Sequence, residues 1–114
     1  MRRTERLPVE LSVTWCRAGR EIACAAVDVN AHGLFIRTDE LVEPESLMHL
    51  KIEVPGSVLE MFVTARFVGR TMSGHGIGVE IFLIDDVTNR HWLSFYEALC
   101  SEQSRARKLS AMGA

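Results

Sequence analysis

Residues 48–67 read MHLKIEVPGSVLEMFVTARF. Every second residue from Met48 to Val54 is apolar, the alternation stops at Pro55-Gly56-Ser57, and it resumes from Met61 to Phe67. A period of two places alternate side chains on opposite faces of a β-strand, and a Pro-Gly-Ser triplet favours a tight turn. The stretch therefore predicts two half-buried strands joined by a hairpin turn, with the apolar residues of both strands facing one core.

The same signals recur on both sides of this hairpin. Apolar and polar residues alternate over 9–15, small and β-branched residues fill 21–29, and further short strands are expected over 33–38 and 77–81. Turn residues separate these segments, and no helical period lies between them. Six short strands without intervening helices predict a mainly β domain of antiparallel strands, closed into a small barrel or packed as a sandwich.

The period changes after Leu83. The carboxylates of Asp85 and Asp86 are suited to cap the first turn of a helix. An apolar stripe at three- and four-residue spacing follows, formed by Trp92, Phe95, Tyr96, Leu99 and Cys100. The stripe fits packing against the β domain and a homodimer seam equally well, so the pattern leaves both open. The apolar period ends near residue 103, and we expect residues 104–114 to form a flexible basic tail.

Composition and charge limit the class of protein. The chain has 114 residues, about one small domain, and its 47% hydrophobic and 25% charged residues are typical of a soluble globular protein. The net charge is −2, yet six of the 13 Lys and Arg residues lie in residues 1–6 and 105–108. A nucleic-acid-binding surface spreads its basic residues over the fold, and no strand shows the exposed aromatic pair of a single-strand platform. We therefore expect neither DNA nor RNA as a partner.

The cysteines and the N-terminus bear on location. Cys16, Cys24 and Cys100 lack CxxC spacing, so they indicate neither a disulfide framework nor a zinc site. We expect free thiols in a reducing cytosol. The N-terminus is charged, and no stretch approaches the about 18 apolar residues of a membrane helix. The sequence predicts a cytoplasmic protein with no metal and no membrane insertion.

Signatures of common enzymes are absent from the sequence, which has no GxSxG, HExxH or GxxxxGK[ST] motif. Gly74, Gly76 and Gly78 form GxGxG, but a strand follows them where a nucleotide-phosphate site needs a helix N-terminus. We interpret these glycines as a turn with close strand contact. No nucleophile, base and orienting group converge, so we expect neither an enzyme nor a cofactor.

Two polar segments are candidates for a binding site. The first has Arg2 and Arg6 in RxxxR spacing, about 13 Å apart if extended at ~3.3 Å per residue. Guanidinium groups bond phosphate oxygens and the O6/N7 edge of guanine, and they stack on bases. In the second, Asp28 could accept N1–H and N2–H of guanine, Asn30 would add a polar contact, and Gly33 would let the backbone approach. Taken singly, each segment also fits a solvated terminus or an ordinary turn.

Together these segments resemble the PilZ domain family. The likeness covers residues 2–100 and rests on RxxxR, a (D/N)xSxxG-like turn at Asp28, Asn30 and Gly33, the Gly-Leu-Phe-Ile run over 33–36, the strand over 63–69, Gly-Val-Glu-Ile over 78–81 and the closing helix. It implies a six-stranded antiparallel β-barrel of the split-barrel type with a C-terminal α-helix. Residues 1–8 would then be an N-terminal arginine arm, and residues 9–103 the barrel with its closing helix.

The resemblance also implies a function. Such a stand-alone domain binds the bacterial second messenger cyclic di-GMP, often as an intercalated dimer, and regulates motility or biofilm formation. Arg2 and Arg6 would clamp phosphates and guanine edges and stack on the bases, and Arg3 would add a third guanidinium nearby. Asp28 would read a guanine edge, and Gly33 would hold the turn. The arm, whose arginines repel one another and lack an apolar anchor, would be mobile until ligand orders it. The ordered arm would signal to an unidentified protein effector.

One residue departs from the family pattern. Asn30 stands where the pattern has serine, and its amide donates and accepts hydrogen bonds but is larger than a hydroxyl. Family members with degenerate motifs bind no nucleotide and act through protein contacts. A nucleotide-free interaction adaptor is therefore the alternative function.

Overall fold

The computed structural model describes residues 5–112, and side chains through residue 109. Six strands precede a single helix in this part of the chain. Their bounds are β1 Leu7–Arg17, β2 Arg20–Asn30, β3 Gly33–Arg37, β4 Leu47–Val54, β5 Ser57–Thr71, β6 Gly74–Leu83 and α1 Asp86–Met112.

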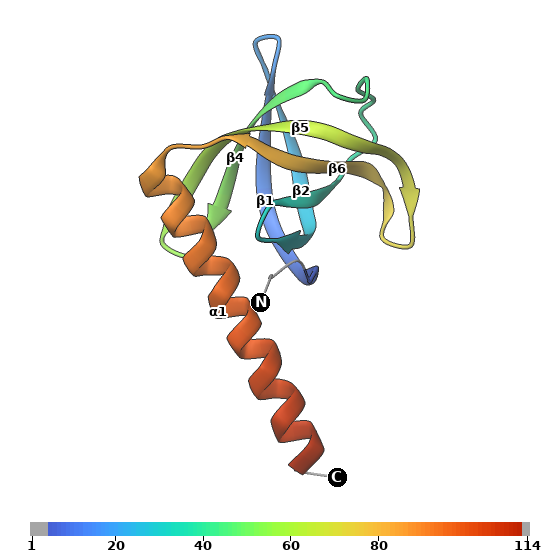
Figure 1. Ribbon diagram of the computed structural model, residues 1–114. Coiled ribbons are helices and arrows are strands. Elements are labelled where there is room, and N and C mark those ends of the chain that lie inside the picture. The colour runs from blue at the N-terminus through green and yellow to red at the C-terminus, as the bar shows by residue number, and fades with distance from the viewer. Residues whose placement is uncertain (1–4, 113–114) are drawn as a thin grey trace.

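The six strands form a closed barrel in the order β1-β2-β3-β6-β5-β4, and every neighbouring pair is antiparallel (Figure 1). Strand β1 closes the barrel by pairing with both β2 and β4. The predicted mainly β fold with a C-terminal helix is confirmed, and the barrel replaces the sandwich that periodicity alone left open.

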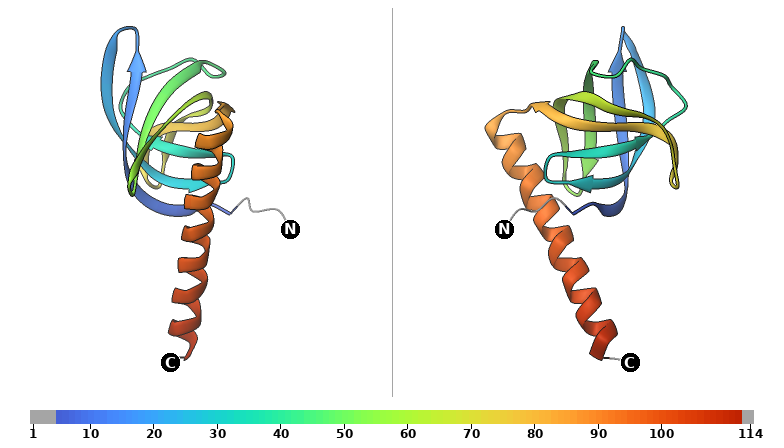
Figure 2. Two further views of the ribbon diagram at one scale, coloured as in Figure 1. Left: turned by 90° about the vertical axis from the view of Figure 1, so that its left-hand side faces the viewer. Right: turned by 45° about the vertical axis from the view of Figure 1, so that its right-hand side comes forward.

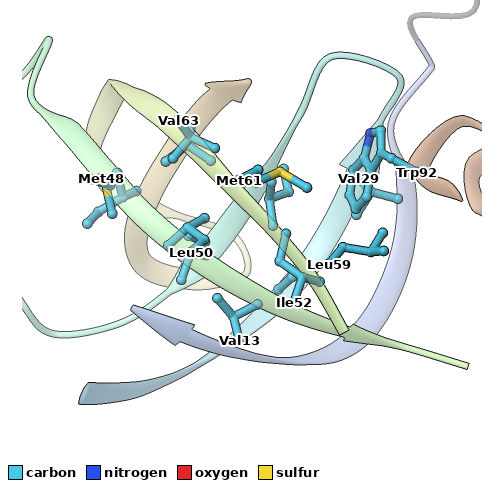
Figure 3. Close-up of a cluster of buried hydrophobic side chains, with 14 of the residues drawn as sticks. Val13, Val29, Met48, Leu50, Ile52, Leu59, Met61, Val63 and Trp92 are labelled. Atoms are coloured by element: carbon cyan, nitrogen blue, oxygen red, sulfur yellow. The ribbon is translucent and has the colours of Figure 1, made fainter. Parts of the chain in front are cut away.

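The β4–β5 hairpin contributes its alternating apolar residues to the barrel interior. Met48, Leu50 and Ile52 of β4 are at most 2% exposed and point inward beside Met61 and Val63 of β5 (Figure 3). Burial of such side chains is worth roughly 1.5–3 kcal/mol each. This alternation, rather than any polar network, therefore sets the register of the barrel.

Phe67 departs from the predicted alternation. The sequence run from Met61 to Phe67 predicts an inward ring, yet Phe67 is 47% exposed. The β5–β6 register shifts between Ala65 and Phe67, so that Ala65 pairs with Val79 but Phe67 pairs with Gly78. A β-bulge of this kind adds one residue to one strand and exchanges its faces. The bulge therefore turns Phe67 onto the outer surface.

Helix α1 begins with the predicted cap. Asp85 Oδ1 accepts the backbone N–H of Thr88 at 2.8 Å, and Oδ2 accepts the Thr88 hydroxyl at 2.9 Å. These hydrogen bonds lower the pKa of the Asp85 carboxyl. Trp92, Tyr96 and Cys100 are buried in the core cluster, so the apolar stripe packs against the barrel.

The helix continues to Met112, beyond the boundary predicted at residue 103 (Figure 2). Residues 101–112 contain Ala, Leu, Arg, Lys and Gln but neither Gly nor Pro, and these residue types favour a helix even without an apolar stripe. The helix is therefore longer than the apolar stripe alone predicted. The flexible basic tail over residues 104–114 stays a prediction. Within residues 5–112, α1 does not have the run of apolar residues needed to cross a membrane.

Candidate functional site

The N-terminal arm is held in place from residue 5 onward. Leu7 is 2% exposed and belongs to the core cluster. The Tyr96 hydroxyl donates to the backbone carbonyl of Glu5 at 2.7 Å, and Arg107 Nη2 donates to Glu5 Oε2 at 2.7 Å. Figure 1 shows the start of β1 beside the middle of α1. The expectation that the arm lacks an apolar anchor was wrong, because Leu7 supplies one. Arg2 and Arg3 lie outside the described residues.

The structure brings together two of the predicted site residues. Arg6 Nη1 donates to Asp28 Oδ1 at 2.5 Å, across 22 positions of sequence. Asp28 lies on β2 opposite Phe35 of β3, just past a shift in register. The Arg6 side chain is 51% exposed and the Asp28 side chain 27%. An ion pair this open to solvent contributes about 0–1 kcal/mol to stability, so a ligand that competes for both groups loses little by separating them.

Asn30 and Gly33 serve the turn between β2 and β3. Asn30 Oδ1 accepts the backbone N–H of His32 at 2.8 Å, which closes an Asx turn. A Cβ atom on Gly33 would lie 2.1 Å from the Val79 carbonyl oxygen. Close approach of β3 to β6 therefore requires glycine at this position. Contact of either residue with a ligand stays a prediction.

A hollow of about 480 Å³ opens beside the Arg6–Asp28 pair. This volume lies within the roughly 300–1,000 Å³ of ordinary ligand sites. Its lining residues come from the arm and from β2, β3, β5 and β6: Arg6, Asp28, Phe35, Phe67, Thr71, Met72, Ser73 and Gly78. The charged side chains of Arg6 and Asp28 thus line one side of the hollow, and the tip of the β5–β6 hairpin lines another.

The glycines of β6 make room for the aromatic floor of this hollow. A Cβ on Gly76 would come within 2.8 Å of the Phe35 ring, and one on Gly78 would contact Phe67 and Phe35 at 3.5 and 3.8 Å. Phe35 is thereby 5% exposed, whereas Phe67 presents half of its surface. The interpretation of GxGxG as close strand contact is confirmed at Gly76, where a Cβ would also meet the Ile36 carbonyl at 2.1 Å.

Sequence reasoning missed Phe67 and Met72. Phe67 reads as a core residue because the bulge before it leaves no mark in the pattern of apolar residues. Met72 is fully exposed at the hairpin tip. A large apolar residue within the Thr-Met-Ser-Gly turn at 71–74 was the available signal, because such turns are ordinarily polar.

A larger hollow, about 590 Å³, lies elsewhere and suits an anion less well. Arg37, Arg70 and His75 line it, but so do the carboxylates of Asp39 and Glu40. Glu40 is also within 3.6 Å of Arg17 and Arg20. Within residues 5–112, no cluster of His, Cys, Asp and Glu could hold a metal ion.

Comparison with known families decides what kind of domain this is. The family model of the PilZ domain matches residues 1–98. The chain belongs to the PilZ domain family. PilZ domains are binding and regulatory modules, and the family is one of cyclic di-GMP receptors that act through protein effectors.

A solved structure shows the same PilZ fold. The Bacillus subtilis inhibitor of motility MotI/DgrA superimposes with a TM-score of 0.74 and 14% sequence identity, over 94% of this chain and 53% of that one. The chain thus spans about half the length of that protein, and the likeness at this identity concerns the fold. No curated protein matched the chain.

Proposed function

We propose that this PilZ domain binds cyclic di-GMP in the hollow beside Arg6 and Asp28 and passes the signal to a protein effector. The observation that supports the proposal is the Arg6–Asp28 pair standing at the edge of a hollow with an exposed aromatic ring. Together these groups supply the three kinds of contact that a guanine nucleotide uses: a cation, an acceptor pair and a stacking surface.

Each group has a distinct part in the proposal. The Arg6 fork donates to phosphate or to the guanine O6/N7 edge. The Asp28 carboxylate is an acceptor only, and it accepts N1–H and N2–H of guanine. The half-exposed Phe67 ring stacks on a base, a contact worth roughly 1–3 kcal/mol. Arg2 and Arg3 add positive charge that offsets the two phosphates of the ligand.

The signal would leave the site through the arm. Arg6 follows Glu5, whose carbonyl and carboxylate bind Tyr96 and Arg107 of α1. When Arg6 turns from Asp28 to the ligand, the segment between the site and α1 changes position. A partner that contacts the arm or the helix then meets a different surface.

Titration calorimetry with cyclic di-GMP tests the proposal. Arg6→Ala and Asp28→Ala each remove a charged hydrogen-bond partner, worth roughly 1.5–3 kcal/mol, and should weaken binding by about tenfold or more. Arg90→Ala is the matched control, because Arg90 is exposed on α1 away from the hollow. If the wild type binds and neither site variant weakens binding, the nucleotide binds at another site. If the wild type gives no heat with cyclic di-GMP, the proposal is wrong.

A nucleotide-free adaptor is the second candidate. Asn30 replaces the usual serine, and its carbonyl oxygen is already engaged with the His32 N–H. In that case a partner should be recovered equally well with and without cyclic di-GMP, and calorimetry should stay silent. Recovery that changes on adding the nucleotide would exclude the adaptor.

A further inference from the structure

The C-terminal end of α1 extends past the barrel, as the views in Figures 1 and 2 agree. Residues 104–109 are all exposed. A helix end that carries an exposed leucine gains from a packing partner, because apolar surface is then removed from water. Leu109, 61% exposed, is that leucine.

One face of this helix carries a symmetric pattern. Ala98, Glu102, Arg105 and Leu109 follow one another at spacings of four, three and four, so they lie on one face of the helix. All four are exposed. The spacings are the same from either end of the pattern. If two such helices lie antiparallel, Leu109 of one therefore stands opposite Ala98 of the other, and Arg105 stands opposite Glu102.

We infer that this face is a self-association surface, on which α1 of a second copy of the chain docks antiparallel about a two-fold axis. The proposal stands apart from nucleotide binding. The axis passes between residues 103 and 104, so Glu102 of each copy meets Arg105 of the other. A parallel pair would instead set Glu102 against Glu102 and Arg105 against Arg105. Opposite charges therefore select the antiparallel arrangement.

A hollow beside the helix receives the apolar end of the pattern. It measures about 440 Å³ and lies between α1 and the β4–β5 turn, with Phe95 and Ala98 on the helix side and Val54, Pro55 and Gly56 on the turn side. In the antiparallel register, Leu109 of the second copy lies opposite Ala98, at the edge of this hollow. Small and large apolar residues thus face each other twice in the dimer.

The neighbouring helix face helps to choose between surfaces. Glu97, Ser101, Ser104 and Lys108 share the same four-three-four spacing and the same charge symmetry. These four positions carry no apolar residue, whereas Ala98 of the first face lines the hollow beside the β4–β5 turn. Because association of two copies of a chain is favoured by the burial of apolar surface, the face that carries Ala98 and Leu109 is the one that docks.

Light scattering coupled to size-exclusion chromatography of the full chain tests the inference over a dilution series. The wild type should approach twice its 12.8 kDa as concentration rises. Glu102→Arg or Arg105→Glu should each raise the dimer dissociation constant about tenfold or more, because both create like-charge contacts. The double variant carrying both changes should restore the dimer.

Control variants make the test specific. Glu97→Arg and Lys108→Glu carry the same charge changes on the neighbouring face and should leave the dimer intact. All four positions are exposed, and circular dichroism verifies that each variant folds. The inference is overturned by a wild type that stays monomeric, by a dimer that ignores both single reversals, or by one that Glu97→Arg disrupts.

Discussion

Gly76→Ala should destabilise the barrel by about 2–3 kcal/mol, and Gly78→Ala, two residues further along β6, should not. A Cβ on Gly76 would lie 2.1 Å from the Ile36 carbonyl oxygen, about 1.3 Å short of ordinary 3.4 Å contact. Relief requires β3 and β6 to separate, which combines an overpacking cost of about 1–3 kcal/mol with a ladder hydrogen bond worth about 0.5–1.5. The reduced entropy of the unfolded chain returns about 0.4–1 kcal/mol.

The Gly78→Ala variant has only the last of these effects. Its new methyl group would meet Phe67 and Phe35 at 3.5 and 3.8 Å, which is ordinary contact. Urea unfolding followed by circular dichroism measures the stability of both variants. Their thermal midpoints should differ by roughly 10–20 °C at about 4–8 °C per kcal/mol. Equal stabilities, or a Gly78 variant that is the weaker of the two, would refute the close β3–β6 approach.

Two further predictions concern α1. Asp85→Ala should lower the thermal midpoint at pH 7, because it removes the helix cap. Hydrogen bonds from Thr88 lower the pKa of the Asp85 carboxyl in the folded protein. The stability that this carboxylate contributes is therefore fully present above the unfolded pKa of 3.8, and it is lost as pH falls through the folded pKa. A difference between wild type and variant that persists undiminished at pH 2 would contradict the cap. Tyr96→Phe should cost about 1 kcal/mol in urea unfolding, because it removes the hydroxyl that donates to the Glu5 carbonyl; an unchanged midpoint would show that this bond contributes nothing.

The fold was predictable because the barrel interior obeys a simple period. From Met48 to Ile52 and from Leu59 to Val63 every second residue is apolar and buried, so residue spacing specifies strand faces. The sequence-based predictions are wrong where the alternation of apolar residues is interrupted or absent. The bulge before Phe67 reverses the strand faces without changing composition, and the tail of α1 is helical by propensity rather than by stripe.

Of the residues that line the candidate site, only the charged pair Arg6 and Asp28 could be predicted from the sequence. The order of Arg6 and Asp28 along the chain, taken with the family resemblance, identified two groups that the structure places 2.5 Å apart. The aromatic floor depends on rings laid over the glycines of β6 and on a hairpin tip distant in sequence. Such contacts arise from barrel closure, and local spacing carries no sign of them. Leu7 escaped notice for the same reason, since its burial depends on residues of the core cluster that are distant in sequence.

Parallel titration with cyclic di-GMP and cyclic di-AMP tests the central claim most directly. Adenine lacks the adjacent N1–H and N2–H donors and presents only its N6 amino group beside an acceptor N1, so it cannot give the Asp28 carboxylate the paired contact that guanine gives. Losing hydrogen bonds to a charged group costs roughly 1.5–3 kcal/mol, or about tenfold or more in affinity. The proposed site predicts saturable heat with cyclic di-GMP and binding of cyclic di-AMP at least about tenfold weaker. No heat with cyclic di-GMP, or equal affinity for the two nucleotides, would contradict it.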